Sequence, residues 1–276
     1  MGRIRTFSWA LCIAGVIAGV VTTKEPVQAE SLTVGAAYSL RTAFQEIVPM
    51  FEREYGTTVQ VVYGPSQTLR RQIENGAAID VFLPAAVTEI EKLEKKGLTL
   101  NGGARIYAQT SLVLVMSAAS RATPISFRDA FPARATRIAL GDPKTSALGE
   151  ITASALIRLD PAYKSRFHLL HAQHSEDIVD LVRTEAADVG IVYRVDAINS
   201  RHMRIIDEQP AGAYLPVSFG EAMVWTCRKA SLVVAEEFLD FMMSPRIQKL
   251  LLKYGFESVP ATGPGGESEA VKMSAR

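Results

Sequence analysis

The chain has 276 residues, of which 48% are hydrophobic, and its 30 basic and 29 acidic side chains nearly cancel. This length and apolar content are typical of a globular protein with one large or two modest domains. The balanced charge provides no basic excess for nucleic acid or for an anionic membrane surface, so we expect neither as a partner.

Residues 1–29 have the pattern of a cleavable secretory signal peptide. Arg3 and Arg5 precede an apolar run over residues 7–21, and the small residue Ala29 follows shortly afterwards. The apolar run is too short to span a bilayer comfortably. We therefore expect cleavage after Ala29 and an exported protein that is not inserted in the membrane.

The two cysteines also bear on export. Cys12 lies within the signal peptide and lacks the small residue expected just before a lipidated cysteine, so we do not expect a lipoprotein. Once the signal peptide is removed, Cys227 remains alone in an apolar context, and we interpret it as an inert buried thiol. The mature chain therefore forms no internal disulfide and depends on its hydrophobic core for stability.

From residue 32 onward the chain alternates between strand and helix patterns. An apolar, β-prone run leads through small residues to Ser39, and the helix that follows has one apolar face and ends before Gly56. The patterns predict further strands over 57–63 and 79–85, and helices over 67–75 and 88–96. The last of these helices is highly charged, and we interpret its charges as a solvated face. The β-α-β-α-β-α order is typical of a parallel, doubly wound sheet.

A second alternation follows an apolar strand over residues 111–117, which is long enough to pass between two domains. The patterns predict helices over 147–158, 175–184, 232–243 and 245–254, and strands over 137–141, 167–173, 189–193, 203–207 and 214–219. Residues 257–276 are rich in Gly, Pro, Ser and Glu, and we expect them to be disordered.

The two alternations predict an α/β protein with two doubly wound lobes joined by two crossover strands. Lobe 1 is expected to comprise residues 30–110 and 217–256, and lobe 2 residues 111–216. Ligands of such sheets bind at the carboxyl ends of the strands. In a bilobed protein this location is the cleft between the lobes.

Four helix starts lie directly after strands and are expected to face this cleft. They are Ser39 and Ser66 in lobe 1, and residues 147–148 and 175–178 in lobe 2. The first N–H groups of a helix have no partner within the helix, and the helix dipole adds partial positive charge. With the serine hydroxyls, these donors form a cage with almost no formal charge, which suits a dehydrated anion. For Ser39 the alternative is a simple N-cap.

Seven stretches resemble, in the same order, the periplasmic molybdate-binding proteins of ABC importers. Ala36-Ala37-Tyr38-Ser39-Leu40 is similar to A-A-A-S-L, residues 66–76 to S-S-T-L-A-R-Q-I-E-A-G, and residues 80–85 to D-L-F-I-S-A. The others are Gly141-Asp142-Pro143, Glu176-Asp177, Gly190-Ile191-Val192-Tyr193 and Tyr254-Gly255-Phe256. Each motif is weak alone, but seven in register are specific. They cover residues 31–256, nearly the whole mature chain.

The resemblance implies a type II periplasmic binding protein fold that holds a tetrahedral oxyanion, molybdate or tungstate, between the lobes. It implies hydroxyl and backbone donors at Ser39 and Ser66, a phenol donor at Tyr193, and backbone N–H donors at Leu148 and Ile178. The alignment reaches Ile178 only after a short deletion. The resemblance implies no enzymatic activity, no catalytic residue, no cofactor and no metal cation held by side chains. It also implies a periplasmic monomer that delivers its ligand to an ABC permease in the inner membrane.

Tyr38 departs from the family pattern, which has an alanine at this position. A bulky ring beside Ser39 is expected to narrow the cleft or cover the ligand. The preferred anion therefore stays open between molybdate, tungstate and another tetrahedral oxyanion such as sulfate.

Two other classes of function are alternatives. A serine hydrolase is disfavoured because Thr68 stands where the nucleophile elbow G-x-S-x-G around Ser66 requires its second glycine. A receptor for a transition-metal cation would use His168, His171 and His174. Their apolar neighbours favour a strand, which places His171 on the opposite face from the other two. We therefore expect ordinary surface or core histidines.

Overall fold

The computed structural model of the protein describes residues 31–122, 137–166, 168–208 and 216–259. The predicted signal peptide and most of the predicted tail lie outside these ranges. Glu257, the first residue of that tail, pairs with Gln109 through two backbone hydrogen bonds of 2.8 and 2.9 Å. The beginning of the tail is therefore held against lobe 1.

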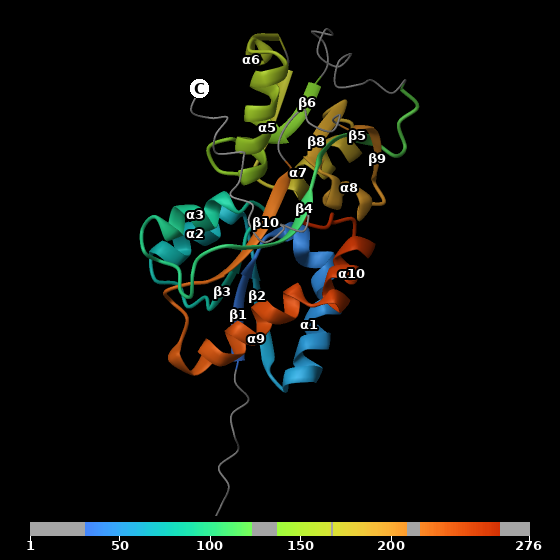
Figure 1. The fold of residues 1–276 in the computed structure, drawn as a ribbon. Helices are drawn as coiled ribbons and strands as arrows, with labels where there is room; N and C mark the ends of the chain where they lie inside the picture. Colours follow the sequence, from blue (N-terminus) through green and yellow to red (C-terminus); the bar gives the residue numbers. More distant parts are fainter. Residues whose placement is uncertain (1–30, 123–136, 167, 209–215, 260–276) are drawn as a thin grey trace, which may run out of the picture.

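Lobe 1 is the lower part of the molecule in Figure 1 and contains a five-stranded sheet of order β2-β1-β3-β10-β4. Its strands are β1 (Ser31–Ala36), β2 (Thr58–Tyr63), β3 (Val81–Leu83), β4 (Arg105–Thr110) and β10 (Val217–Met223). Its helices are η1 (Tyr38–Leu40), α1 (Arg41–Tyr55), α2 (Ser66–Glu74), α3 (Thr88–Glu94), η2 (Lys229–Ser231), α9 (Leu232–Met243) and α10 (Pro245–Lys253).

Lobe 2 is the upper part in Figure 1 and contains a second five-stranded sheet, of order β7-β6-β8-β5-β9. Its strands are β5 (Leu112–Ser117), β6 (Arg137–Gly141), β7 (His168–Ala172), β8 (Val189–Tyr193) and β9 (Met203–Glu208). Its helices are α5 (Ala147–Leu159), α6 (Tyr163–Arg166), α7 (Ser175–Arg183) and α8 (Arg194–Ile198). The prediction of two α/β lobes is confirmed.

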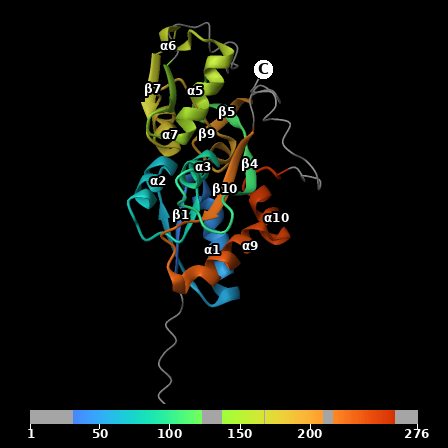
Figure 2. The same ribbon diagram turned by 60° about the vertical axis from the view of Figure 1, so that its left-hand side comes forward.

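The chain enters lobe 2 at Ser111, between the end of β4 in one sheet and the start of β5 in the other. The sequence patterns predicted only the strand after this point and missed β4, because Arg105 and Gln109 interrupt its apolar character. In each sheet, one strand runs antiparallel to both of its neighbours: β10 to β3 and β4, and β5 to β8 and β9. Figure 2 shows β4 and β10 extending from lobe 1 toward lobe 2.

The apolar face of α1 forms the core of lobe 1 with α9. Phe44 and Phe51 pack against Phe238, with ring centroids 6.3 and 5.0 Å apart. Gly56 ends α1 in the left-handed region at φ 66°, which glycine adopts without steric penalty. No helix within the described ranges is long and apolar enough to span a membrane.

Candidate functional site

A small cavity of about 40 Å³ lies between the two lobes. Its walls come from the segments where strands end and helices begin, together with two single residues: 37–39, 64–66, 146–148, 173–175, Ala85 and Tyr193. Space of this size accommodates a few water-sized atoms, which is the scale of one tetrahedral oxyanion. Ser39, Ser66, Leu148 and Tyr193 line the cavity, and Ile178 does not.

Ser66 is the first residue of α2 and is only 5% exposed. Its Oγ accepts a hydrogen bond of 3.0 Å from the backbone N–H of Ala85. Because a hydroxyl has one proton and two lone pairs, this bond leaves the proton to donate into the cavity. The backbone N–H of Ser66 belongs to the first turn of α2 and has no partner within the helix. Ser66 therefore offers two donors at one place.

Ser39 is the middle residue of η1, the short helix that joins β1 to α1. The N-cap of η1 is Ala37, and no side chain caps this helix. The interpretation of Ser39 as a simple N-cap is therefore wrong. Ser39 lines the cavity instead, directly after the buried small residues Ala36 and Ala37.

Leu148 is the second residue of α5, which is capped by Ser146: the Ser146 Oγ accepts a hydrogen bond of 3.4 Å from the N–H of Gly149. The Leu148 side chain is buried, which fits a contribution from the main chain at the helix start. A Cβ atom at Gly149 would collide with the backbone carbonyl of Asp142. Glycine at this position therefore allows α5 to begin close to β6 and to the cavity.

The start of α7 is placed differently from the prediction. The N–H of Ile178 bonds to the carbonyl oxygen of His174 at 3.3 Å, and the Ile178 side chain is fully buried. The residues of this helix start that line the cavity are His174 and Ser175. The helix predicted over 175–184 begins at Ser175 as expected, but the alignment did not show which residue of its start faces the cleft.

Tyr193 ends β8 and presents a buried phenol to the cavity. Its hydroxyl has no hydrogen-bond partner among the described residues. Burial raises the pKa of Tyr193 well above its ordinary value of 10, and the carboxyl groups of Asp196, Glu89 and Glu150 raise it further. The phenol is therefore protonated at neutral pH and can donate a hydrogen bond. A buried polar group without a partner costs about 1–3 kcal/mol, and an acceptor in the cavity would remove this cost.

Tyr38 forms part of the cavity wall and contacts lobe 2. Its ring centroid lies 5.1 Å from that of His174 and 6.5 Å from that of Tyr63, with which it stacks. The Arg41 guanidinium lies 4.8 Å over the Tyr38 ring and pairs with Glu176 of α7 at 2.8 Å. The tyrosine that departs from the family pattern thus takes part in a contact between the lobes.

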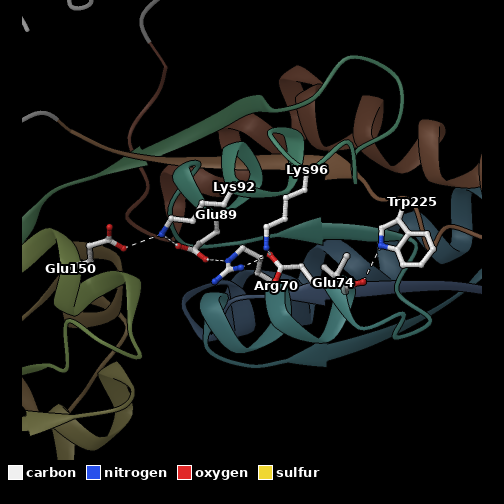
Figure 3. Close-up of polar contacts among 8 residues, drawn as sticks. Arg70, Glu74, Glu89, Lys92, Lys96, Glu150 and Trp225 are labelled. Carbon is white, nitrogen blue, oxygen red and sulfur yellow. Dashed lines mark hydrogen bonds and ion pairs between the residues drawn. The ribbon is translucent and has the colours of Figure 1, made fainter.

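A second ionic contact between the lobes involves α3 and α5, as Figure 3 shows. Glu89 is fully buried, and its carboxylate accepts from Lys92 Nζ at 2.6 Å and from Arg70 Nε at 2.7 Å. Lys92 also reaches Glu150 Oε2 of α5 at 3.2 Å. The interpretation of the charged helix as a solvated face is therefore wrong at Glu89, whose charge is neutralised inside lobe 1.

No lysine or arginine lines the cavity itself within the described part of the chain. Arg41 and Lys92 lie near the cleft, but each pairs with a carboxylate of the other lobe. The groups that line the cavity are hydroxyls, backbone N–H groups at helix starts, and the side chains of Gln173 and His174. The neutral donors among these groups bind an anion through dipoles and hydrogen bonds.

The three clustered histidines do not converge on one point. His168 and His171 line a depression together with Asp142 and Lys144, His171 and His174 line another, and His174 also lines the cavity between the lobes. Among the described residues, no group of three or more His, Cys, Asp or Glu side chains is placed to hold a metal ion. The transition-metal alternative therefore lacks a ligand set in this part of the chain.

The fold and the cavity together define a class of protein. Two α/β lobes with a cage of neutral donors between them are the arrangement of a binding protein with the type II periplasmic binding protein fold. The chain belongs to the bacterial extracellular solute-binding protein family, whose profile matches residues 32–257. This family consists of transport receptors and is not an enzyme family, which disfavours the serine hydrolase alternative.

Individual relatives make the resemblance more specific. The chain is 28% identical over 254 residues to the putative ABC transporter substrate-binding lipoprotein YvgL of Bacillus subtilis, covering 91% of this chain and 96% of that protein. It is 26% identical over 262 residues to the molybdate-binding protein ModA of Haemophilus influenzae, covering 94% and 100%. The predicted resemblance to molybdate-binding proteins is confirmed by these relatives.

Solved structures share the fold. The periplasmic molybdate-binding protein of Azotobacter vinelandii has a TM-score of 0.70 at 24% identity, covering 83% of this chain and 99% of that one. The sulfate-binding protein SubI from Mycobacterium tuberculosis has a TM-score of 0.72 at 18% identity, covering 84% and 88%. At these identities the likeness is one of fold, and the choice of ligand depends on the cavity.

Proposed function

We propose that this protein is a periplasmic receptor that captures molybdate or tungstate between its lobes and delivers it to an ABC importer in the inner membrane. The observation that carries the proposal is the buried phenol of Tyr193, a protonated donor without a partner among the described residues. It faces a cavity that no lysine or arginine of the described residues lines. A fully ionised oxyanion offers only acceptors and so matches such a site. The ModA relatives support the same assignment.

In the proposed mechanism, the anion first meets the helix starts of lobe 1 at Ser39 and Ser66. Closure of the lobes then adds the N–H of Leu148 and the phenol of Tyr193. For the donor from α7 we propose Ser175 in place of Ile178, because the Ile178 N–H is already bonded to His174. Closure also brings Tyr38 against His174, which shields the anion from solvent.

We also propose how the chain is processed on export and where its two lobes begin and end. The signal peptide, residues 1–29, is removed on export, and the mature protein acts as a monomer without a cofactor. Its lobes are residues 30–110 with 217–256, and residues 111–216, and they move about the two crossing segments. The partner is the permease of the importer.

Selection among oxyanions is proposed to depend on size. A smaller anion such as sulfate cannot reach the donors of both lobes at once, so it forms fewer hydrogen bonds in the closed form. Calorimetric titration of both anions checks this point. A tenfold difference in Kd corresponds to about 1.4 kcal/mol of binding free energy. A Kd for sulfate within about tenfold of the Kd for molybdate would contradict the proposed preference.

A thermal-shift screen with molybdate, tungstate, sulfate, phosphate and zinc tests the function. Ligand that binds only the folded state stabilises it by about 2.7 kcal/mol at a hundredfold excess over Kd. We therefore expect molybdate and tungstate to raise the melting temperature by several degrees and zinc to leave it unchanged. A shift with zinc alone would support the metal alternative, and no shift with any of the oxyanions would refute the proposal.

Replacing Ser66 by alanine is expected to weaken both binding and folding. Binding loses one hydrogen bond to a charged group, about 1.5–3 kcal/mol, and the Ala85 N–H loses its buried acceptor, about 1–3 kcal/mol of stability. Titration with molybdate and urea unfolding measure the two losses. Ser154→Ala is the matched control, because the Ser154 hydroxyl donates to the backbone carbonyl of Glu150 on the exposed side of α5. An unchanged molybdate titration for Ser66→Ala would remove Ser66 from the site.

A further inference from the structure

Asp196 is a buried acid beside the cavity that the proposed mechanism does not use. It lies on α8, three residues after Tyr193, and lines a depression of about 580 Å³ between the lobes. This depression shares Tyr38, Ser39 and Ser175 with the oxyanion cavity. The Oδ2 atom of Asp196 is buried and has no hydrogen-bond partner among the described residues.

The hydroxyls near this carboxyl group come from both lobes. Ser39 approaches from η1 of lobe 1, and Ser175 approaches from α7 of lobe 2. Burial raises the pKa of Asp196 from 3.8 to about 6, although the Ser175 and Ser39 hydroxyls act in the opposite direction. The nearby carboxylate of Glu176 raises this pKa further. The Asp196 carboxyl group with this pKa changes its charge around pH 6.

The two serines have competing uses for their protons. Each hydroxyl has a single proton to donate, and an ionised carboxylate can only accept. A proton that Ser39 or Ser175 donates to Asp196 is not available to an anion in the cavity. In addition, a carboxylate beside a bound anion is disfavoured by like-charge repulsion.

We propose that Asp196 is a positioning residue of the oxyanion site whose proton controls the donors of Ser39 and Ser175. As a carboxylate it accepts their protons and repels the anion. When the carboxylate takes up one proton from solvent, the neutral acid becomes a donor to a serine oxygen, and the serine protons turn to the anion. Anion capture is thereby coupled to the uptake of one proton, an inference that rests on the proposed oxyanion function.

Other charged and titratable groups face the same depression and must be separated from Asp196. They are Tyr38 and Arg41 from η1 and α1, Glu176 and Asp180 from α7, and Arg201 and His202 after α8. Arg41 pairs with Glu176 at 2.8 Å, and Asp180 pairs with Arg183 at 3.0 Å. Asp180 and His202 therefore supply matched control variants, since each lines the depression but neither lines the oxyanion cavity.

The test is a calorimetric titration with molybdate between about pH 6 and about pH 8. For one coupled proton, we expect the affinity of the unaltered protein to fall by up to about tenfold per pH unit above the pKa of the free acid. Asp196→Asn holds the neutral state permanently. At pH 8 this variant is expected to bind molybdate at least about tenfold more tightly than the unaltered protein does. Its Kd is expected to vary by less than about threefold between pH 6 and pH 8.

The controls decide between the groups. Asp180→Asn and His202→Gln are expected to show the same fall in molybdate affinity with rising pH as the unaltered protein. The inference would be overturned if molybdate affinity still fell with rising pH in Asp196→Asn, or if it no longer did so in His202→Gln. Binding that is the same at every pH in the unaltered protein would overturn it and leave the proposed function standing. Failure of all the oxyanions to bind at any pH would overturn both.

A second measurement needs no variant, in case Asp196→Asn does not fold. Titrations of the unaltered protein at about pH 7 in two buffers of different ionisation enthalpy report the protons taken up on binding. We expect uptake of close to one proton per anion. No uptake would overturn the inference.

Discussion

Replacing Tyr193 by phenylalanine is expected to weaken molybdate binding by about 10-fold to 150-fold, without destabilising the free protein. The phenol donates one hydrogen bond to a charged ligand, which is worth about 1.5–3 kcal/mol. In the free protein the same hydroxyl is buried without a partner among the described residues. Its removal is therefore neutral for folding or stabilises the protein by up to about 1 kcal/mol. Calorimetric titration and urea unfolding measure these opposite effects.

Tyr107→Phe is the matched control for this experiment. The Tyr107 hydroxyl is also buried without a partner among the described residues, but Tyr107 lies on β4 and does not line the cavity. Its replacement is expected to affect stability in the same direction and to leave molybdate affinity unchanged. If Tyr193→Phe bound molybdate as the unaltered protein does, the phenol would not be a ligand. If it lost several kcal/mol of stability, the hydroxyl would have a structural partner.

Replacing Asp80 by asparagine is expected to cost about 1.5–3 kcal/mol of stability, because a buried carboxylate loses hydrogen bonds to a charged partner, Arg228, whose own side chain is 44% exposed. Asp80 is fully buried. Its carboxylate accepts from Arg228 Nη2 at 2.6 Å, from the Arg228 backbone N–H at 3.0 Å and from the Thr33 N–H at 2.8 Å. These bonds join β1, the start of β3 and the segment that leads into η2. Urea unfolding at neutral pH measures the loss.

The pH dependence of this loss identifies the carboxylate as its cause. Burial raises the pKa of Asp80, but the hydrogen bonds from Arg228 and Thr33 outweigh burial and hold the pKa below its ordinary value of 3.8. A depressed acid pKa contributes stability above the unfolded pKa and loses it as the pH falls through the folded pKa. The difference between Asp80→Asn and the unaltered protein should therefore shrink below about pH 4. An equal difference at pH 7 and in acid would refute this account.

The control for Asp80 is Asp240→Asn. Asp240 pairs with Arg105 at 2.9 Å, but its side chain is 69% exposed. An exposed pair contributes about 0–1 kcal/mol, because water screens it and both side chains lose conformational freedom. We expect Asp240→Asn to change the unfolding free energy by less than about 1 kcal/mol at any pH.

The elements with a clear hydrophobic period were predicted well. The apolar stripe of α1 and the glycine that ends it are local features, and both are present as expected. β4 was missed because its apolar run is only three residues long, between Arg105 and Gln109, and within it Tyr107 is fully buried whereas Ile106 is exposed. The burial of Glu89 was missed because its charge is compensated by Arg70, 19 residues earlier, and no local pattern reports such a partner.

The sequence by itself determined the two α/β lobes, the family and most of the helix starts that surround the cavity, because strand-to-helix junctions are encoded by neighbouring residues. Only the tertiary structure decided how these donors are used. Contacts across the cleft determine whether Tyr193 has a partner and which residue of α7 faces the cleft. They also place Asp196 near serines of both lobes. Arg41 and Glu176, which meet there, are 135 positions apart in the chain. Hydrogen bonds between such distant residues follow from the packing of whole lobes, and a local sequence pattern does not specify them.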